Sequence, residues 1–156
     1  MARYASRKAS LGMDLTKTYP RSPREKLAGL FMLARTTDKA RAYNAGTPGP
    51  YHFGCGMDKH VLGFLGSDPE EFAKVVAARG DEGSIGAWAH AHLQGKSAAD
   101  IESFNADFAQ DAPEPNSDSE GFYKGEQERL GRPDIRTWFD LLDADEGRPV
   151  PQTSAV

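Results

Sequence analysis

The stretch SPREKLAGLFMLARTTDKARAYNAG, residues 22–46, decides the fold that the sequence predicts. Ser22 stands directly before a proline and three residues before a glutamate, which is the capping-box pattern of a helix start with proline at the first helical position. Gly46 is a typical helix stop. We therefore predict one long helix over residues 23–45, with a core-facing stripe made of Leu27, Leu30, Phe31, Ala34 and Ala45.

The rest of the chain carries further helix starts and stops. Segments with an apolar helical period begin near Asp58, Asp68, Ser84, Ser97, Phe122 and Ile135. No segment alternates apolar and polar residues with a period of two. We expect a compact all-α single domain of six to seven helices over residues 14–147, between flexible tails at 1–13 and 148–156. Its core should include Trp88, Trp138 and Phe139.

Charge is distributed unevenly along the chain. Residues 1–45 carry ten Lys or Arg and three acids, a net charge of +7, whereas residues 46–156 carry a net charge of −11. Such a split indicates either an anion-binding half or two halves that pack face to face. The sequence pI near 5.6 disfavours general nucleic-acid binding.

The single cysteine excludes an internal disulfide and favours a reducing compartment, so we expect a cytoplasmic protein. No apolar run reaches the roughly 18 residues of a membrane-spanning helix, and the basic N-terminus lacks the apolar region of a signal peptide. Gly-rich phosphate loops and dinucleotide fingerprints are absent from the sequence, so we expect no cofactor. A homo-oligomer is compatible with the sequence.

Five blocks follow one another between residues 14 and 149, namely DLTKTYPRSPREKL, ARTTDKARAYNAG, YHFGCGMD, FLGSDPEEF and TWFDLLDADEGRP. In this order they resemble the bacterial family called domain of unknown function 5069. The resemblance implies a small bacterial intracellular domain and assigns no catalytic residue. The chain departs from the family pattern at Gly56-Met57, where a Pro-Leu pair is expected, and at Ala34-Arg35, where a Pro-Arg pair is expected.

Charged residues interrupt and flank the predicted apolar stripe. Asp38 and Arg41 fall on the stripe itself, either as a structural ion pair or as a base and an anion ligand that line a cleft. Arg35 and Lys39 lie beside the stripe and can reach a ligand or an acidic neighbour. Two further guanidiniums, those of Arg21 and Arg24, flank the predicted helix start, where backbone N–H groups would complete an anion site.

A turn rich in glycine and proline leads into the candidate residues Tyr51, His52 and Cys55. A histidine can exchange protons near neutral pH, and a thiolate beside a cation is a nucleophile. We favour His52 over Cys55, because a lone cysteine is more often a small buried hydrophobe. A metal site is not predicted, since His-x-x-Cys alone is a weak ligand pattern.

Two functions are compatible with these patterns. The first is a cofactor-independent enzyme that acts on an anionic small molecule by isomerisation, cyclisation or elimination, with Asp38, Arg41 and His52 converging on one cleft. The substrate's carboxylate or phosphate would contact the Arg, Lys and Tyr side chains named above. The alternative is a non-catalytic binding module whose basic N-terminal helix engages an acidic partner.

Overall fold

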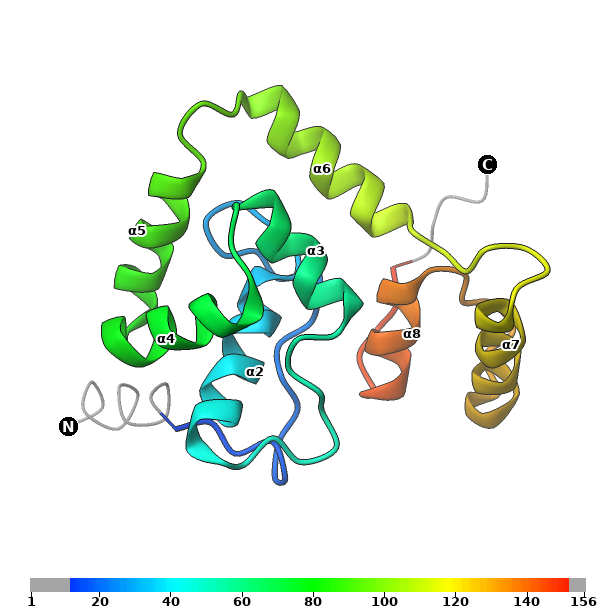
Figure 1. Cartoon of the computed structure of the whole chain (residues 1–156). Coiled ribbons are helices and arrows are strands. Elements are labelled where there is room, and N and C mark those ends of the chain that lie inside the picture. The colour runs from blue at the N-terminus through cyan, green and yellow to red at the C-terminus, as the bar shows by residue number, and fades with distance from the viewer. Residues whose placement is uncertain (1–11, 152–156) are drawn as a thin grey trace.

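The computed structural model describes residues 12–151, and within this range α-helices are the only regular structure larger than one isolated bridge (Figure 1). The seven helices described are α2 (Leu33–Ala45), α3 (Gly56–Phe64), α4 (Pro69–Arg79), α5 (Glu82–His92), α6 (Ala98–Gln110), α7 (Asp118–Leu130) and α8 (Trp138–Asp145). The predicted all-α fold is confirmed. None of these helices is both long and apolar enough to cross a bilayer.

Most of the two expected tails, residues 1–11 and 152–156, lies outside the described residues. At the end of the described chain, Arg148 donates a hydrogen bond to the carbonyl oxygen of Pro20 over 2.6 Å. Val150 packs beside a hydrophobic cluster of the last two helices. Contacts with the domain therefore extend to residue 150.

The first described helix begins at Leu33 and not at Pro23, so the boundary predicted from the capping-box pattern is wrong. Ser22 does accept a hydrogen bond from the backbone N–H of Arg24 at 3.1 Å, but the signal produces only an isolated turn. A favourable cap does not extend into a helix unless the residues that follow keep helical backbone angles.

The segment before α2 leaves the helical conformation in a tight reversal. Ala28, Gly29 and Met32 have positive φ angles of 53°, 78° and 74°, and glycine adopts such an angle without steric cost. The backbones of Leu27 and Leu30 hydrogen bond to each other across the turn. Leu30 and Met32 both become buried, although two positions apart in a helix they would not share a face.

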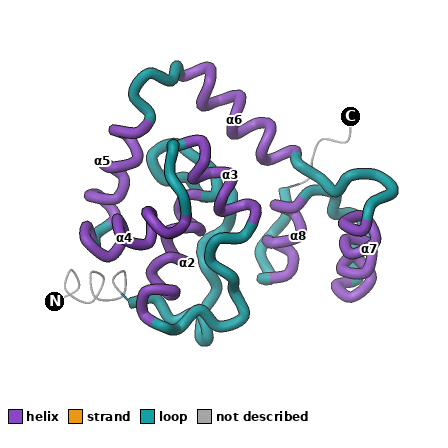
Figure 2. Tube along the Cα trace, viewed as in Figure 1, coloured by secondary structure: helices purple, strands orange, loops and turns teal. Residues whose placement is uncertain are grey.

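Helix α2 lies at the centre of the molecule, in contact with α3 and α4 (Figures 1 and 2). Every residue from 33 to 42 is buried, including five with ionisable or hydroxyl side chains on successive positions, Arg35, Thr36, Thr37, Asp38 and Lys39. Buried charges are stable only when they are paired. The other elements must therefore bring counter-charges to this helix.

The remaining helices begin at side-chain caps. Asp68 and Ser97 cap α4 and α6 as predicted, each accepting a backbone N–H in the first turn. Helix α5 begins after Asp81, earlier than expected. Ser117 and Thr137 cap α7 and α8, so α7 also starts earlier than expected and α8 starts after the predicted Ile135 position.

Apolar side chains form two clusters. The larger one joins the five helices from α2 through α6 with α8, and it includes Leu33, Leu62, Phe72, Ile85, Trp88 and Phe139. The smaller one lies between α7 and α8, around Tyr123, Ile135 and Leu141. Trp138 is only partly buried beside this cluster, which corrects its expected core position. Its indole ring therefore remains partly exposed to solvent.

Candidate functional site

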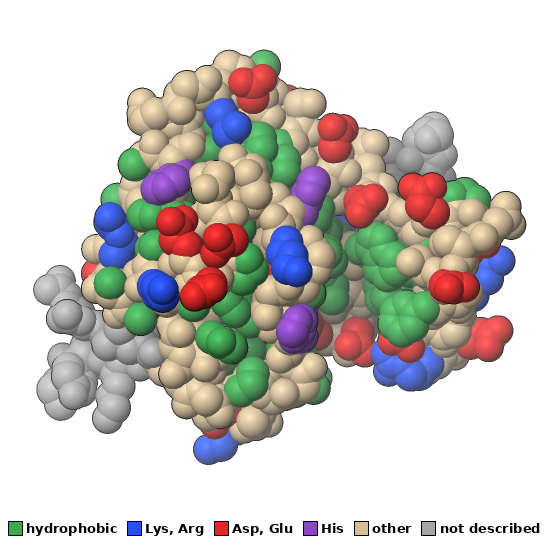
Figure 3. All heavy atoms as spheres, in the orientation of Figure 1, with side chains coloured by type: hydrophobic (Ala, Val, Ile, Leu, Met, Phe, Trp, Pro, Cys, Tyr) green, Lys and Arg blue, Asp and Glu red, His purple; other side chains and the backbone are tan. Residues whose placement is uncertain are grey.

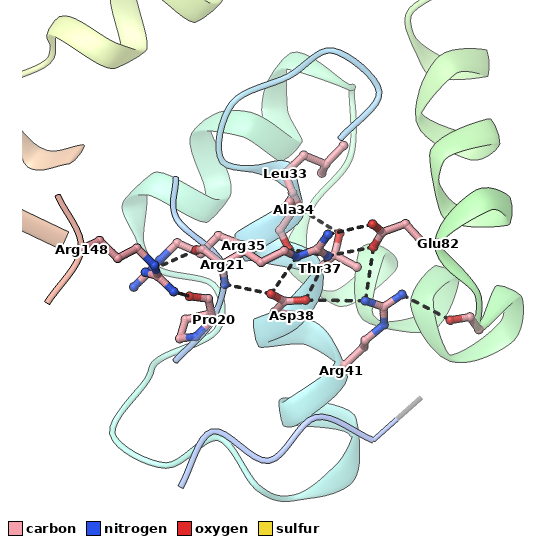
Figure 4. Close-up of polar contacts among 11 residues, drawn as sticks. Pro20, Arg21, Leu33, Ala34, Arg35, Thr37, Asp38, Arg41, Glu82 and Arg148 are labelled. Carbon is pink, nitrogen blue, oxygen red and sulfur yellow. Dashed lines mark hydrogen bonds and ion pairs between the residues drawn. The ribbon is translucent and has the colours of Figure 1, made fainter. Parts of the chain in front are cut away.

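The buried carboxylate of Asp38 lies at the centre of an ion network whose Arg21 and Glu82 side chains are partly exposed (Figure 4). Its carboxylate accepts three hydrogen bonds from Arg21, from the backbone N–H at 2.9 Å and from Nε and Nη2 at 3.0 Å each. Arg21 also donates to Glu82 of α5 at 2.7 and 2.8 Å. Arg41 completes the network, 3.6 Å from Asp38 and 3.5 Å from Glu82. These bonds from Arg21, opposed in part by burial, hold the pKa of the Glu82 carboxyl below its ordinary value.

This network does not form an open site. Asp38 and Arg41 meet as an ion pair, which is the structural alternative considered for them. His52 is exposed and makes no hydrogen bond or ion pair with the described residues. Neither of two cavities, of about 640 and 520 Å³, is lined by any of these three side chains. Asp38, Arg41 and His52 therefore share neither of these two cavities.

Arg35 and Tyr51 are bound to the C-terminal segment. Arg35 donates to both oxygens of Glu146, from Nη1 at 2.8 Å and from Nη2 at 2.6 Å. The Tyr51 hydroxyl donates to the same carboxylate at 2.9 Å, and Arg148 also pairs with it. Burial, together with this bond to Glu146, raises the pKa of Tyr51 above its ordinary value. Both predicted ligand groups are therefore occupied by a carboxylate of the chain.

Arg24 holds α8 and does not form the predicted anion site. Its guanidinium donates to Asp140 and to Asp143 at 2.7 Å each, and it lies 5.8 Å from the centre of the Phe139 ring. The predicted site with Arg21 at a helix N-terminus is corrected on two grounds. The helix does not begin there, and both guanidiniums already bind two carboxylates each.

The uneven charge along the chain is thereby explained in large part by ion pairs between its two halves. Five cations of residues 21–41 meet carboxylates of α3, α5, α8 and the segment after α8, namely Arg21, Arg24, Arg35, Lys39 and Arg41. Because these carboxylates lie in the half with the net charge of −11, the halves do pack face to face.

Lys39 differs from the other cations because it contacts a thiol as well as a carboxylate. Its Nζ lies 2.8 Å from Oδ2 of Asp58 and 3.5 Å from Sγ of Cys55. Asp58 is completely buried and also accepts the Thr36 hydroxyl at 2.7 Å and the backbone N–H of Gly54 at 2.9 Å. These bonds fix the position of the Lys39 ammonium beside the sulfur.

Cys55 occupies the N-cap position of α3 and is half-buried, not a core residue. It lines the cavity of about 640 Å³, together with Gly56, Met57, His60, Asp107, Phe108, Asp111 and Trp138. We call this cavity the α3–α6 cleft. Figure 3 shows a recess between the main body and the lobe of α7 and α8, with hydrophobic side chains along it and acidic side chains near its edge.

The histidine in the α3–α6 cleft is His60 and not His52. Its ring stacks on Phe104 at 5.1 Å between centroids and meets the edge of Phe108 at 4.7 Å. The sequence does contain a local signal for the α3 wall of the cleft. Met57 and His60 are three positions apart in the helix capped by Cys55, so their side chains lie on the same face of that helix. The opposite wall comes from α6 and α8, whose proximity has no local sequence signal.

Within residues 12–151, no three His, Cys, Asp or Glu side chains are grouped so that they could hold a metal ion.

A comparison with curated proteins found no match for the chain. The family described as "Domain of unknown function (DUF5069)" matches residues 17–148, which is most of the 156 residues. The ordered sequence blocks and this match together show that the chain belongs to the DUF5069 family.

Proposed function

We propose that this protein is an enzyme that acts on a small molecule in the α3–α6 cleft, with the Cys55 thiolate as nucleophile. One observation carries the proposal. Cys55 lines the cleft while its sulfur lies 3.5 Å from the buried ammonium of Lys39. Reactive cysteines are found in partly exposed positions at helix N-termini and beside cations.

A buried positive charge lies directly beside this sulfur. Lys39 is 6% exposed, so water screens its attraction for the sulfur only weakly. Asp58 is a competing partner, but the Thr36 hydroxyl and two backbone N–H groups also bind its carboxylate. The free N–H groups at the start of α3 add a further positive potential.

The roles of the other residues follow from their positions. The thiolate would add to the carbon of a polar double bond in the substrate, and the π electrons of that bond would move onto its oxygen or nitrogen. His60 is the histidine of the same cleft that would supply a proton to that atom. Proton transfer by Asp38 and His52 is not retained, because one is sealed in the ion network and the other lies outside the cleft lining. A reduced thiol suits the cytoplasmic location expected from the sequence.

The binding-module alternative has less support. Its basic N-terminal helix is replaced by turns before Leu33, and Arg21 and Arg24 are bound to carboxylates of the chain. Lys17 and Lys26 remain exposed, yet two exposed lysines do not define a surface for an acidic partner.

Alkylation kinetics test the proposed function. Iodoacetamide is neutral, so its reaction rate at pH 7 reports the thiolate fraction and access of Cys55. We expect the folded protein to react at least about tenfold faster than a peptide of residues 50–59, because the ordinary thiol is largely protonated at this pH. Lys39→Met should remove most of the difference, whereas Lys59→Met, which removes an exposed lysine from α3, the helix that follows Cys55, should not.

A second variant separates reactivity from folding. Lys39→Met leaves the buried Asp58 without its cation, so the double variant Lys39→Met/Asp58→Asn removes both charges of the pair. Thermal melts followed by circular dichroism identify which variant is folded at the assay temperature. A folded protein that reacts no faster than the peptide, or equal rates with and without Lys39, would overturn the proposal.

A further inference from the structure

We infer that the α3–α6 cleft selects a small organic cation, an amine or guanidinium compound with an apolar body, as the substrate of Cys55. This inference rests on the proposed function and names the substrate class of the same site. It replaces the anionic substrate expected from the sequence, because the Arg and Lys side chains expected to hold an anion are bound to carboxylates of the chain and none of them lines the cleft.

The charged groups on the α6 wall are carboxylates without counter-charges. Asp107 and Asp111 are one helical turn apart and both line the cleft. Both side chains are exposed, and neither makes a hydrogen bond or ion pair within residues 12–151. Two neighbouring carboxylates repel each other, and a cation between them removes that repulsion.

The sequence around this wall offers no neutralising cation. Residues 97–123 contain seven acids and no Lys, Arg or His. Several acids elsewhere in the second half, among them Glu82, Asp140 and Glu146, are bound by cations of the first half. A cleft wall of one charge sign raises the local concentration of small ions of the opposite sign. The segment that forms this wall of the cleft therefore carries negative charge and no cation of its own.

The rest of the lining suits the apolar part of such a ligand. Met57 and Phe108 provide apolar surface, and the partly exposed Trp138 offers an indole ring, the aromatic group that binds cations best. The volume of about 640 Å³ fits a small molecule. Lys39, the buried cation beside Cys55, does not line the cleft and is paired with Asp58, so it does not neutralise the α6 carboxylates.

The geometry orients the ligand across the cleft. The carboxylates belong to α6, and the thiol belongs to the start of α3 on the facing wall. A ligand whose cationic end lies beside Asp107 and Asp111 would present its other end to Cys55. The electrophilic carbon is therefore expected at the end of the molecule remote from the positive charge.

Charge-matched thiol reagents test this inference directly. Aminoethyl methanethiosulfonate is cationic, the sulfonatoethyl compound is anionic and the methyl compound is neutral, yet all three transfer an alkylthio group to the Cys55 thiolate and release methanesulfinate. We expect the ratio of cationic to anionic rate constants to exceed that of the peptide of residues 50–59 by about tenfold at low salt. Added salt should reduce the ratio.

Matched variants locate the charge that produces the preference. Asp107→Asn/Asp111→Asn should bring the ratio close to that of the peptide. Glu102→Gln/Glu114→Gln removes the same charge from exposed acids of the same segment that do not line the cleft, and it should retain most of the preference.

The outcomes separate the two proposals. A ratio equal to that of the peptide, or a preference for the anionic reagent, overturns the cationic substrate class even if neutral reagents still react rapidly. Slow alkylation that does not depend on Lys39 overturns the nucleophile, while the ratio of charged reagents still reports on the α6 wall. If no reagent modifies Cys55 in the folded protein, both proposals are overturned.

Discussion

Replacing Glu146 by Gln measures how much the buried charges around α2 contribute to stability. Glu146 accepts two hydrogen bonds from Arg35 and one from the Tyr51 hydroxyl. The side chains of Arg35 and Glu146 are 2% and 1% exposed. The substitution keeps the shape of the side chain and one acceptor oxygen, but it leaves the buried guanidinium without a counter-charge.

The expected loss follows from this burial. Removing one partner of a buried ion pair lowers the free energy of unfolding by about 3–5 kcal/mol. Because the Gln side chain keeps one acceptor oxygen for Arg35, we expect the loss for Glu146→Gln to lie near the lower end of this range. A loss of about 3 kcal/mol is a large fraction of the roughly 5–15 kcal/mol that stabilises a typical domain. Urea unfolding followed by circular dichroism would measure it as a lower midpoint at unchanged slope.

Two further variants decide whether burial is the cause. Asp134→Asn breaks an exposed pair with Arg132 and should leave the midpoint almost unchanged. Arg35→Met/Glu146→Met removes both buried charges and should be more stable than Glu146→Gln. If Glu146→Gln shifts the midpoint as little as Asp134→Asn, water must reach Arg35 and the reasoning about α2 fails.

Three other substitutions test the packing, the ion network and a helix cap. Phe139→Ala should lower the free energy of unfolding by about 3–5 kcal/mol, and Trp138→Ala by clearly less because Trp138 is partly exposed; equal losses in urea unfolding would contradict the assigned burial. The folded pKa of Glu82 lies below the ordinary 4.5, so its contribution is complete above pH 4.5 and is lost as pH falls through the lower folded value. Stability of the native protein should thus fall more steeply below pH 4.5 than that of Glu82→Gln, and parallel acid profiles would exclude this role. Thr137→Ala should cost about 1 kcal/mol in thermal or urea unfolding through loss of the α8 cap, and an unchanged stability would argue against that cap.

The all-α fold was predictable because most helix starts carry their own caps. Asp68 and Ser97 accept the backbone N–H groups that their positions in the sequence indicate. Ser22 presents the same pattern without a helix after it. The difference lies in the residues that follow, since burying Leu30 and Met32 together requires a reversal with positive φ angles. A local cap cannot reveal this tertiary preference.

The candidate site was predictable only where it depends on a single helix. The position of Asp38 and Arg41 on an apolar stripe correctly indicated buried charge, but the sequence could not identify Arg21 and Glu82 as their partners. The α3–α6 cleft joins residues from 55 to 138, so its lining depends entirely on how distant helices pack. Cys55 therefore could not be distinguished from a buried cysteine before its neighbours were placed.

The cations of α2 contribute to the stability of the fold, and one of them also contributes to the candidate site. Arg35 reaches the segment after α8, Arg41 reaches α5, and Lys39 reaches α3, so each cation fixes a different part of the chain on the central helix. Besides carboxylates, Arg35 and Arg41 contact backbone carbonyl oxygens, and Arg35 also lies over the Tyr51 ring. Lys39 alone among the three also contacts a thiol that lines a cavity. Substitutions at Arg35 or Arg41 should consequently change stability while the alkylation rate of the folded fraction stays the same, whereas substitution of Lys39 should change both.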